Sequence, residues 1–448
     1  MKTFSIGRLL KSGIYLFCFL ASICSLKAQT ADSATIKLSL NEAIRYAKGC
    51  NKLIGVLKTE ESAAQLDVED AKMGALPRVL SNASYQRYSN VTLYEDVLGD
   101  SRKITKPPNA NAGALGLEAS FNLYSGGRQR YVIADLKHKG ELASINTKEQ
   151  EANIALQVAL QYLDMIRLYF HEHLIDDQIT RAQTRSKNIA AFYANGKVTK
   201  SDVLRADVLL SNVLLSETAN ENDYLISNQR LNTLLNLDEF TKIIPVDTTS
   251  LVLTDSMELV RLLEDFSGTY AILKARKSID LQKNRTKLAR SFHLPAATLY
   301  GGYGFNYPNT LVFPPQAQTF AVGLVGMKVS YDISSLYQNK YRVKASRLRE
   351  EELCQQKDYI EDNVTQEASA LAIKYNEAVN RLSVIKKSIE QAETNYNIQN
   401  TKYLNQLTLL TDLLEADNLY QEARFNYIQA NIAALSIYYR LLFLTGKL

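Results

Sequence analysis

Apolar and polar residues alternate along Leu115-Gly116-Leu117-Glu118-Ala119-Ser120-Phe121-Asn122-Leu123. Glu118, Ser120 and Asn122 occupy even positions, whereas the odd positions are apolar. Successive side chains of a strand point to opposite faces of a sheet, so this period of two predicts a strand with one apolar and one polar face. The run Met327-Lys328-Val329-Ser330-Tyr331-Asp332-Ile333 has the same pattern. The chain therefore contains two copies of a one-sided strand.

The two strands belong to an internal duplication. Phe121-Asn122-Leu123 aligns with Tyr331-Asp332-Ile333, 210 residues later, and the same spacing carries Asp202-Val203-Leu204 onto Asp412-Leu413-Leu414. Upstream, Leu76-Pro77 aligns with Leu294-Pro295 at a spacing of 218, so the second copy is eight residues shorter in between. We expect two repeats, each with a helix, one β-hairpin and long helices. The expected bounds are 29–237 for the first repeat (hairpin about 78–124), 238–254 for an equatorial linker and 255–448 for the second repeat (hairpin about 296–333).

The distribution of proline and glycine predicts very long helices. Proline is absent from 109–244 and 316–448, and glycine is absent from 197–267 and 327–445; these two residues interrupt helices most strongly. A capping box formed by Ser39 and Glu42 begins an earlier helix, which we expect to continue to about Gly74. Apolar residues at alternate spacings of four and three form a heptad seam, typical of helices packed lengthwise: Leu371, Tyr375, Ala378, Leu382, Ile385, Ile389, Ala392 and Tyr396.

Residues 1–28 have the pattern of a signal peptide, with basic residues, then an apolar run, then Ala28 before the expected cleavage site. Removing its four basic residues (Lys2, Arg8, Lys11 and Lys27) from the whole-chain charge of +5 leaves a net charge near +1. A nearly neutral chain lacks the basic excess of nucleic-acid-binding proteins. We therefore expect an exported protein that does not bind nucleic acid.

No segment after residue 28 approaches the roughly 20 apolar residues that a membrane-spanning helix requires. If the protein crosses a membrane, it does so with strands. Four strands cannot close a barrel, because even small barrels need about eight, so several chains would have to combine their hairpins. The alternative is a half-buried sheet packed on the helices of a soluble protein. A periplasmic coiled-coil adaptor or scaffold that spans no membrane is the corresponding alternative function.

The chain resembles the TolC family of outer membrane efflux proteins over nearly all of its mature length. The residues that carry the resemblance are the strand-to-helix junction from Phe121 to Arg128, the turn segments 193–206 and 403–416, and Leu444-Thr445-Gly446 near the end. The resemblance implies a fold that is mainly α with β. It comprises a long antiparallel α-helical coiled-coil barrel and four β-strands per chain, which contribute to a trimeric 12-stranded transmembrane β-barrel.

The function implied by the resemblance is that of an outer-membrane channel in a tripartite efflux or type I secretion system. Such a channel is a passive conduit for exported small molecules or polypeptides, lies in the outer membrane and extends into the periplasm. The implied partners are two further copies of the chain, a periplasmic adaptor (membrane fusion) protein, an inner-membrane pump of RND or ABC type, and outer-membrane lipid. Neither catalysis nor a cofactor is implied.

The resemblance also implies a periplasmic gate, with a selectivity ring at positions that match Asp412 and Glu415. These residues are three apart and share one helix face, so three chains would place six carboxylates around one axis, attracting cations and repelling anions. The alternative is that both are ordinary solvated acids. Tyr403 and Asp202 match the polar latch between the turns. Thr408 stands where some members have a latching arginine, so we expect an incomplete latch.

Two candidate sites of other kinds fail on spacing. His171-Glu172-His173 suggests a metal site, but residues two apart on a helix point to nearly opposite faces, so we interpret both histidines as surface residues. Gly126-Gly127-Arg128 lacks the Lys-Ser/Thr pair of a phosphate-binding loop. No nucleophile with a plausible base and orienting acid is found. We therefore predict neither a metal site within one chain nor enzymatic activity.

Overall fold

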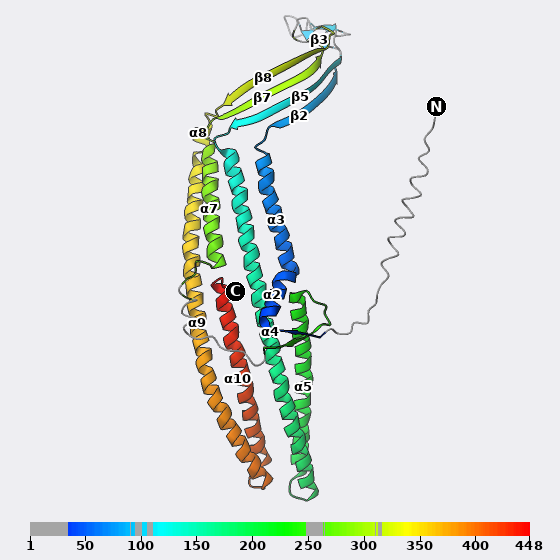
Figure 1. The fold of residues 1–448 in the computed structure, drawn as a ribbon, viewed down its shortest axis with the longest axis vertical. Helices are drawn as coiled ribbons and strands as arrows, with labels where there is room; N and C mark the ends of the chain where they lie inside the picture. The colour runs from blue at the N-terminus through cyan, green and yellow to red at the C-terminus, as the bar shows by residue number, and fades with distance from the viewer. Residues whose placement is uncertain are drawn as a thin grey trace, which may run out of the picture.

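The computed structural model describes residues 35–89, 91–94, 101–104, 111–247, 263, 265–309, 311 and 316–448. The predicted signal peptide at 1–28 lies outside the described residues, as do residues 248–254 of the predicted linker. The molecule is elongated. A sheet lies at one end, and at the other end lie two turns, each of which connects a pair of helices (Figure 1).

Two helices of about 100 Å form the length of the molecule, at 1.5 Å per residue. Helix α4 (Arg128–Ala194) has 67 residues and α9 (Lys340–Leu404) has 65. Each is followed by a tight turn and an antiparallel partner, α5 (Lys200–Leu235) for α4 and α10 (Leu410–Leu444) for α9. The expectation of very long helices in the two stretches without proline is confirmed, and α4 continues through Gly140. Near the sheet, α3 (Lys52–Met73) and α7 (Tyr270–Ser291) lie beside α4 and α9, and α8 (Ser335–Gln338) is a single turn.

The heptad seam of α9 packs as predicted. Tyr375, Leu382 and Ile385 are buried, and they pack in clusters with α10 residues such as Ala434 and Ala430. Interdigitated apolar side chains along two antiparallel helices are the main stabilising interaction of such rods, since isolated helices are marginally stable in water.

The helix expected from Ser39 to about Gly74 is in fact two helices, α2 (Leu40–Cys50) and α3. The capping box of Ser39 and Glu42 is present. Asn51 then takes an extended conformation and caps α3 by accepting hydrogen bonds from the amides of Leu53 and Ile54. Its Nδ2 donates to the carbonyl of Leu234, at 2.8 Å. A tertiary contact therefore favours the break, which lies between Gly49 and Gly55.

The main sheet has four antiparallel strands in the order β2-β5-β7-β8. Their bounds are β2 Arg78–Arg87, β5 Asn111–Tyr124, β7 Ala296–Tyr307 and β8 Phe320–Ser330. Each half of the chain thus supplies one hairpin. Beyond β2, the short strands β3 (Val91–Tyr94) and β4 (Ser101–Ile104) pair with each other.

The two faces of this sheet differ in chemistry. Leu117 of β5 lies opposite Tyr303 of β7 on the apolar face, and both side chains are more than half exposed. On the other face, Glu118 lies opposite Gly302. A cavity of about 480 Å³ lies against the sheet, with Asn82, Ser84, Glu118, Ser120 and Asn306 among its lining residues. The face that carries Glu118 therefore mixes these polar side chains with Leu80 and Leu324, whereas the opposite face is apolar and uncovered.

A second, two-stranded sheet lies near the middle of the molecule. Strand β1 (Thr35–Leu38) pairs in parallel with β6 (Lys242–Pro245). The hydroxyl of the fully buried Tyr162 donates to the carbonyl of Leu38 at 2.8 Å, and burial raises the pKa of this phenol. Two four-residue strands so far apart in the sequence give no periodic signal, so this pairing was not predicted.

The junction between β5 and α4 depends on Gly126, which has a positive φ of 64°. A Cβ atom at this position would lie 2.7 Å from the carbonyl oxygen of Ser291 and 2.8 Å from Cβ of Leu294. The junction of the first hairpin thus packs directly against the end of α7, which leads into the second hairpin.

Candidate functional site

The candidate site lies at the two turns farthest from the sheet (Figure 1). In the first turn, Asn195 follows α4 as its C-cap, Gly196 takes a left-handed conformation (φ 69°), and Thr199 caps α5. In the second turn, Gln406 takes the equivalent left-handed conformation (φ 61°). The two turns therefore keep the same backbone path although their side chains differ.

Asp202 caps its own helix. Its Oδ2 accepts hydrogen bonds from the Thr199 hydroxyl (2.7 Å) and the Thr199 amide (3.0 Å), while the Asp202 amide donates to the Thr199 hydroxyl (3.2 Å). The hydrogen bonds from Thr199 hold the pKa of Asp202 below its usual value. This carboxylate fixes the first turn of α5.

Tyr403 lies at the end of α9 and is 6% exposed. Its ring meets that of Phe192 edge-on, with centroids 6.3 Å apart. The hydroxyl is buried and has no hydrogen-bond partner among the described residues. Burial, with a smaller contribution from the charge of Asp202, raises the pKa of Tyr403.

The two predicted latch residues, Tyr403 and Asp202, line one cavity of about 380 Å³ between the turns. Thr408 also lines this cavity. Its hydroxyl donates to Oδ2 of Asp412 at 2.8 Å, within the second turn. Within the described residues no hydrogen bond joins the Tyr403 hydroxyl to Asp202, so the cavity separates the two turns at this point.

Asp412 and Glu415 lie in the first two turns of α10, and both are exposed. The buried positions of the same segment are Leu410, Leu413, Leu414, Ala416 and Asp417. The two predicted ring residues therefore share the face of α10 that points away from the core of its own chain. Each chain has this pair of acids in its second repeat alone, because the first repeat has Arg205 at the position equivalent to Glu415.

Asp417 is an additional site residue that the sequence analysis missed. It is 4% exposed, and its carboxylate contacts two arginines of α4: Oδ2 lies 2.5 Å from the guanidinium of Arg185, and Oδ1 lies 3.3 Å from that of Arg181. Arg181 also lies over the ring of Tyr396 of α9, at 5.9 Å. This buried ion pair joins the second pair of helices to the first.

The equivalent position in the first repeat behaves differently. Asp207 is exposed and accepts a hydrogen bond from Ser186 within its own helix pair, at 3.0 Å. The duplicated pattern hides this difference. The sequence contains one sign that Asp417 is buried: it lies on the apolar face of α10, next to Leu413 and Leu414.

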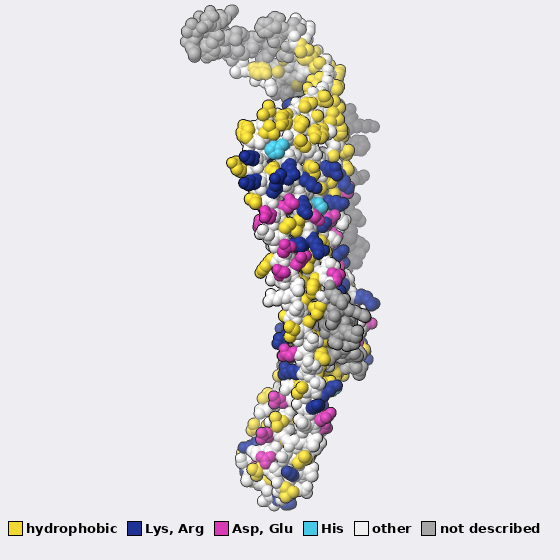
Figure 2. Space-filling model, turned by 90° about the vertical axis from the view of Figure 1, so that its left-hand side faces the viewer, with side chains coloured by type: hydrophobic (Ala, Val, Ile, Leu, Met, Phe, Trp, Pro, Cys, Tyr) yellow, Lys and Arg dark blue, Asp and Glu magenta, His cyan; other side chains and the backbone are white. Residues whose placement is uncertain are grey.

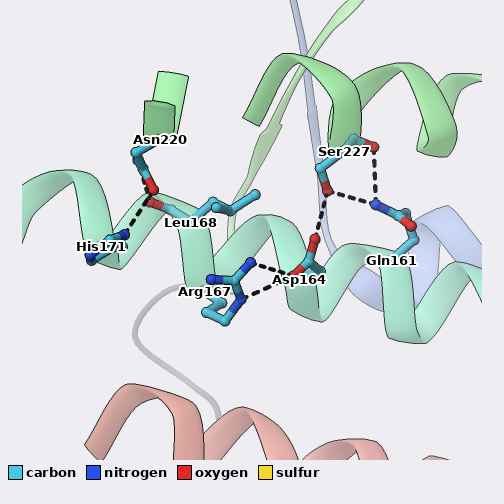
Figure 3. Close-up of polar contacts among 7 residues, drawn as sticks. All are labelled: Gln161, Asp164, Arg167, Leu168, His171, Asn220 and Ser227. Carbon is cyan, nitrogen blue, oxygen red and sulfur yellow. Dashed lines mark hydrogen bonds and ion pairs between the residues drawn. The ribbon is translucent and has the colours of Figure 1, made fainter. Parts of the chain in front are cut away.

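His171 and His173 do not form a joint site. Nδ1 of His171 lies 2.9 Å from Oδ1 of Asn220, in a row of polar contacts between α4 and α5 that includes Gln161 with Ser227 (Figure 3). Burial lowers the pKa of His171. The interpretation of both histidines as surface residues was therefore wrong for His171, which joins two helices. The described residues contain no cluster of three or more potential metal ligands.

No protein-family model matches the chain, and no curated protein does. Solved structures do match. The outer-membrane channel OprN aligns with 91% of this chain and 90% of its own, at 18% identity and a TM-score of 0.73. The outer membrane protein VceC of Vibrio cholerae aligns with 91% of this chain and 96% of its own, at 16% identity and 0.73. The chain has the fold of an outer-membrane channel.

A third channel of this fold, CmeC of Campylobacter jejuni, aligns with 91% of this chain and 85% of its own, at 14% identity and a TM-score of 0.70. The predicted resemblance to the TolC family is thus confirmed at the level of the fold, with long helices and a few strands in one chain. Among the described residues, no helix has the length and apolar character to cross a membrane.

Proposed function

We propose that the protein is a passive outer-membrane channel. Three chains would combine their hairpins in one 12-stranded barrel, and their helices would continue as a tunnel into the periplasm. The observation that carries the proposal is the difference between the two faces of the main sheet: one is apolar and uncovered, and the other carries the polar side chains Glu118, Ser120 and Asn306 among apolar ones. Lipid would cover the apolar face, and water would fill the side that carries the polar residues. The fold shared with known channels supports the same interpretation.

The sheet also supports the trimer. Within the described residues, β2 and β8 are the outer strands of the main sheet, and each pairs on one side only. Unpaired backbone groups in lipid are costly, so these two edges need partners from neighbouring chains. The proposed energy source is an inner-membrane pump of RND or ABC type, coupled through a periplasmic adaptor, in efflux or type I secretion.

Reconstitution of the purified protein in a planar bilayer tests the channel directly. We expect an SDS-resistant trimer in the outer-membrane fraction and small channels that are mostly closed. A monomer that fractionates with the soluble periplasm and conducts nothing would instead support the alternative of a coiled-coil adaptor or scaffold.

The acidic ring is part of the proposal. In a trimer, Asp412 and Glu415 would place six carboxylates at the narrow end, and clustered carboxylates favour divalent cations. We expect Asp412→Ala combined with Glu415→Ala to weaken block by Mg²⁺ by about tenfold, as expected for the loss of about 1.4 kcal/mol of binding free energy. Single-channel recordings at increasing Mg²⁺ concentration measure the effect.

A matched control is available on α9. Glu390 and Glu393 are also exposed acids three residues apart, but they lie more than two helical turns before the second turn. Glu390→Ala combined with Glu393→Ala removes the same charge with the same spacing. Equal weakening of the Mg²⁺ block by both double variants would contradict a localised ring.

A further inference from the structure

Basic residues gather at the ends of three helices next to the main sheet. The segments 128–139 of α4, 283–290 of α7 and 340–349 of α9 contain thirteen lysines and arginines but only one acid, Asp135. Figure 2 shows Lys and Arg side chains in this part of the helical region, directly below a zone of apolar side chains. Exposed apolar residues near this border are Leu294, Tyr331, Ile333, Leu336, Tyr337 and Tyr341.

Few of these cations are neutralised within the chain. Lys139 and Arg285 share Asp135, at 2.9 and 3.0 Å. Arg128 and Arg342 lie over the ring of Phe292, at 5.0 and 4.9 Å. The others are exposed and have no acidic partner among the described residues; we call them the basic belt: Arg130, Lys137, Lys283, Lys287, Arg290, Lys340, Lys344, Arg347 and Arg349.

The basic belt on α7 occupies one helix face. Lys283, Lys287 and Arg290 are four and three residues apart, so they point in the same direction. The neighbouring faces of α7 are occupied: Gln282 donates to Ser346 of α9, and Asn284 donates to the carbonyl of Tyr131 of α4. The belt residues of α7 therefore point out of the helical layer, toward solvent.

We propose that the basic belt binds the headgroups of anionic phospholipids in the membrane leaflet nearest the helices. The proposal rests on the proposed function, since that places lipid against the apolar face of the sheet. The belt then lies at the level of the phosphates, and exposed tyrosines at the same border suit the interface between lipid and water. Attraction between basic side chains and an anionic leaflet falls off within about 10 Å at 0.1 M salt, so the belt residues nearest the sheet, such as Arg290 and Lys340, should contribute most.

The test uses the full-length protein in mild detergent, titrated with fluorescent phosphatidylglycerol or phosphatidylcholine. We expect tighter binding of phosphatidylglycerol, weakened by salt. The triple variant Lys283→Gln, Lys287→Gln, Arg290→Gln should lose at least about tenfold in affinity for phosphatidylglycerol, given the attraction of each cation near an anionic surface. The control variant Lys52→Gln, Arg230→Gln, Lys387→Gln removes the same residue types from exposed helical positions away from the sheet and should bind like the unmodified protein.

Equal affinity for the two lipids would overturn the proposal that the belt binds anionic lipid, and so would equal weakening of binding in both triple variants. Competition by soluble glycerol phosphate as strong as by the lipid would also overturn it, because it would indicate a site for free anions. Bilayer conductance and the SDS-resistant trimer are measured on the same preparation. Channels without a preference for phosphatidylglycerol contradict the belt alone, whereas a preparation without channels or trimers contradicts the proposed function.

Discussion

Asp417→Asn is expected to raise the open probability of the proposed channel more than any other single substitution at the turns. The substitution keeps the shape of the side chain but removes the charge that Arg181 and Arg185 share. Removing one partner from a buried ion pair costs about 3–5 kcal/mol, because the remaining charges stay buried without compensation. Both arginines retain some solvent contact, so we expect the lower end of this range.

The position of the pair determines which property changes. It joins α10 to α4 and is buried, whereas the ion pair of Arg424 with Asp177, which joins the same two helices at 2.9 Å, is exposed. If the proposed gate opens by moving the second helix pair away from the first, the ion pair stabilises the closed state. A loss of about 3 kcal/mol would shift the ratio of open to closed states by about a hundredfold. Single-channel recording measures this ratio.

Asp207→Asn is the matched control, since Asp207 occupies the equivalent position in the first repeat and contacts only its own helix pair. We expect its open probability to match that of the unmodified protein. If the Asp417→Asn protein forms channels that stay as closed as those of the unmodified protein, this pair has no role in closing the proposed tunnel.

Gly126→Ala is the second substitution with a large expected effect. It adds the left-handed penalty of a residue with a Cβ, about 1 kcal/mol, and places that Cβ 2.7 Å from a backbone oxygen of the neighbouring helix end. Because that oxygen belongs to the backbone, the junction must shift. We expect a total loss of about 3 kcal/mol or more, by analogy with overpacked cores, and a lower melting temperature of the SDS-resistant trimer.

Gly196→Ala separates the two contributions. Gly196 has nearly the same φ, 69°, but nothing lies within 4 Å of its Cβ position. It should therefore lose only the backbone contribution of about 1 kcal/mol. Equal melting temperatures for the Gly126→Ala and Gly196→Ala proteins would contradict a steric effect of the close contact between residue 126 and Ser291.

The sequence predicted those parts of the fold that depend on local periodicity. The alternation around Glu118 indicates β5 because the sheet has two different faces, and the seam through Tyr375 and Leu382 indicates the packing of α9. Tertiary contacts determine the remainder. Asn51 breaks a helix by donating a hydrogen bond to the carbonyl of Leu234. Strand β1 pairs with β6 although most of the first half of the chain lies between them in the sequence.

The candidate site divides in the same way. Asp412 and Glu415 lie on the exposed face of α10, as their spacing indicates. Tyr403 and Asp202 line one cavity, although no hydrogen bond joins them in the part of the chain that the structure describes. Their roles as ring and latch stay predictions. The sequence marks Asp417 only as an aspartate on the apolar face of α10. Its partners could not be predicted, because they lie on another helix more than 200 residues away.

The parallel pairing of β1 with β6 has a consequence for the order in which the protein folds. Strand β1 is among the first described segments to be made, yet its partner follows only after α4 and α5. Contacts between residues so distant in sequence form slowly, because a long loop must close first. During export, residues 35–38 therefore remain unpaired until about 200 further residues have crossed the inner membrane.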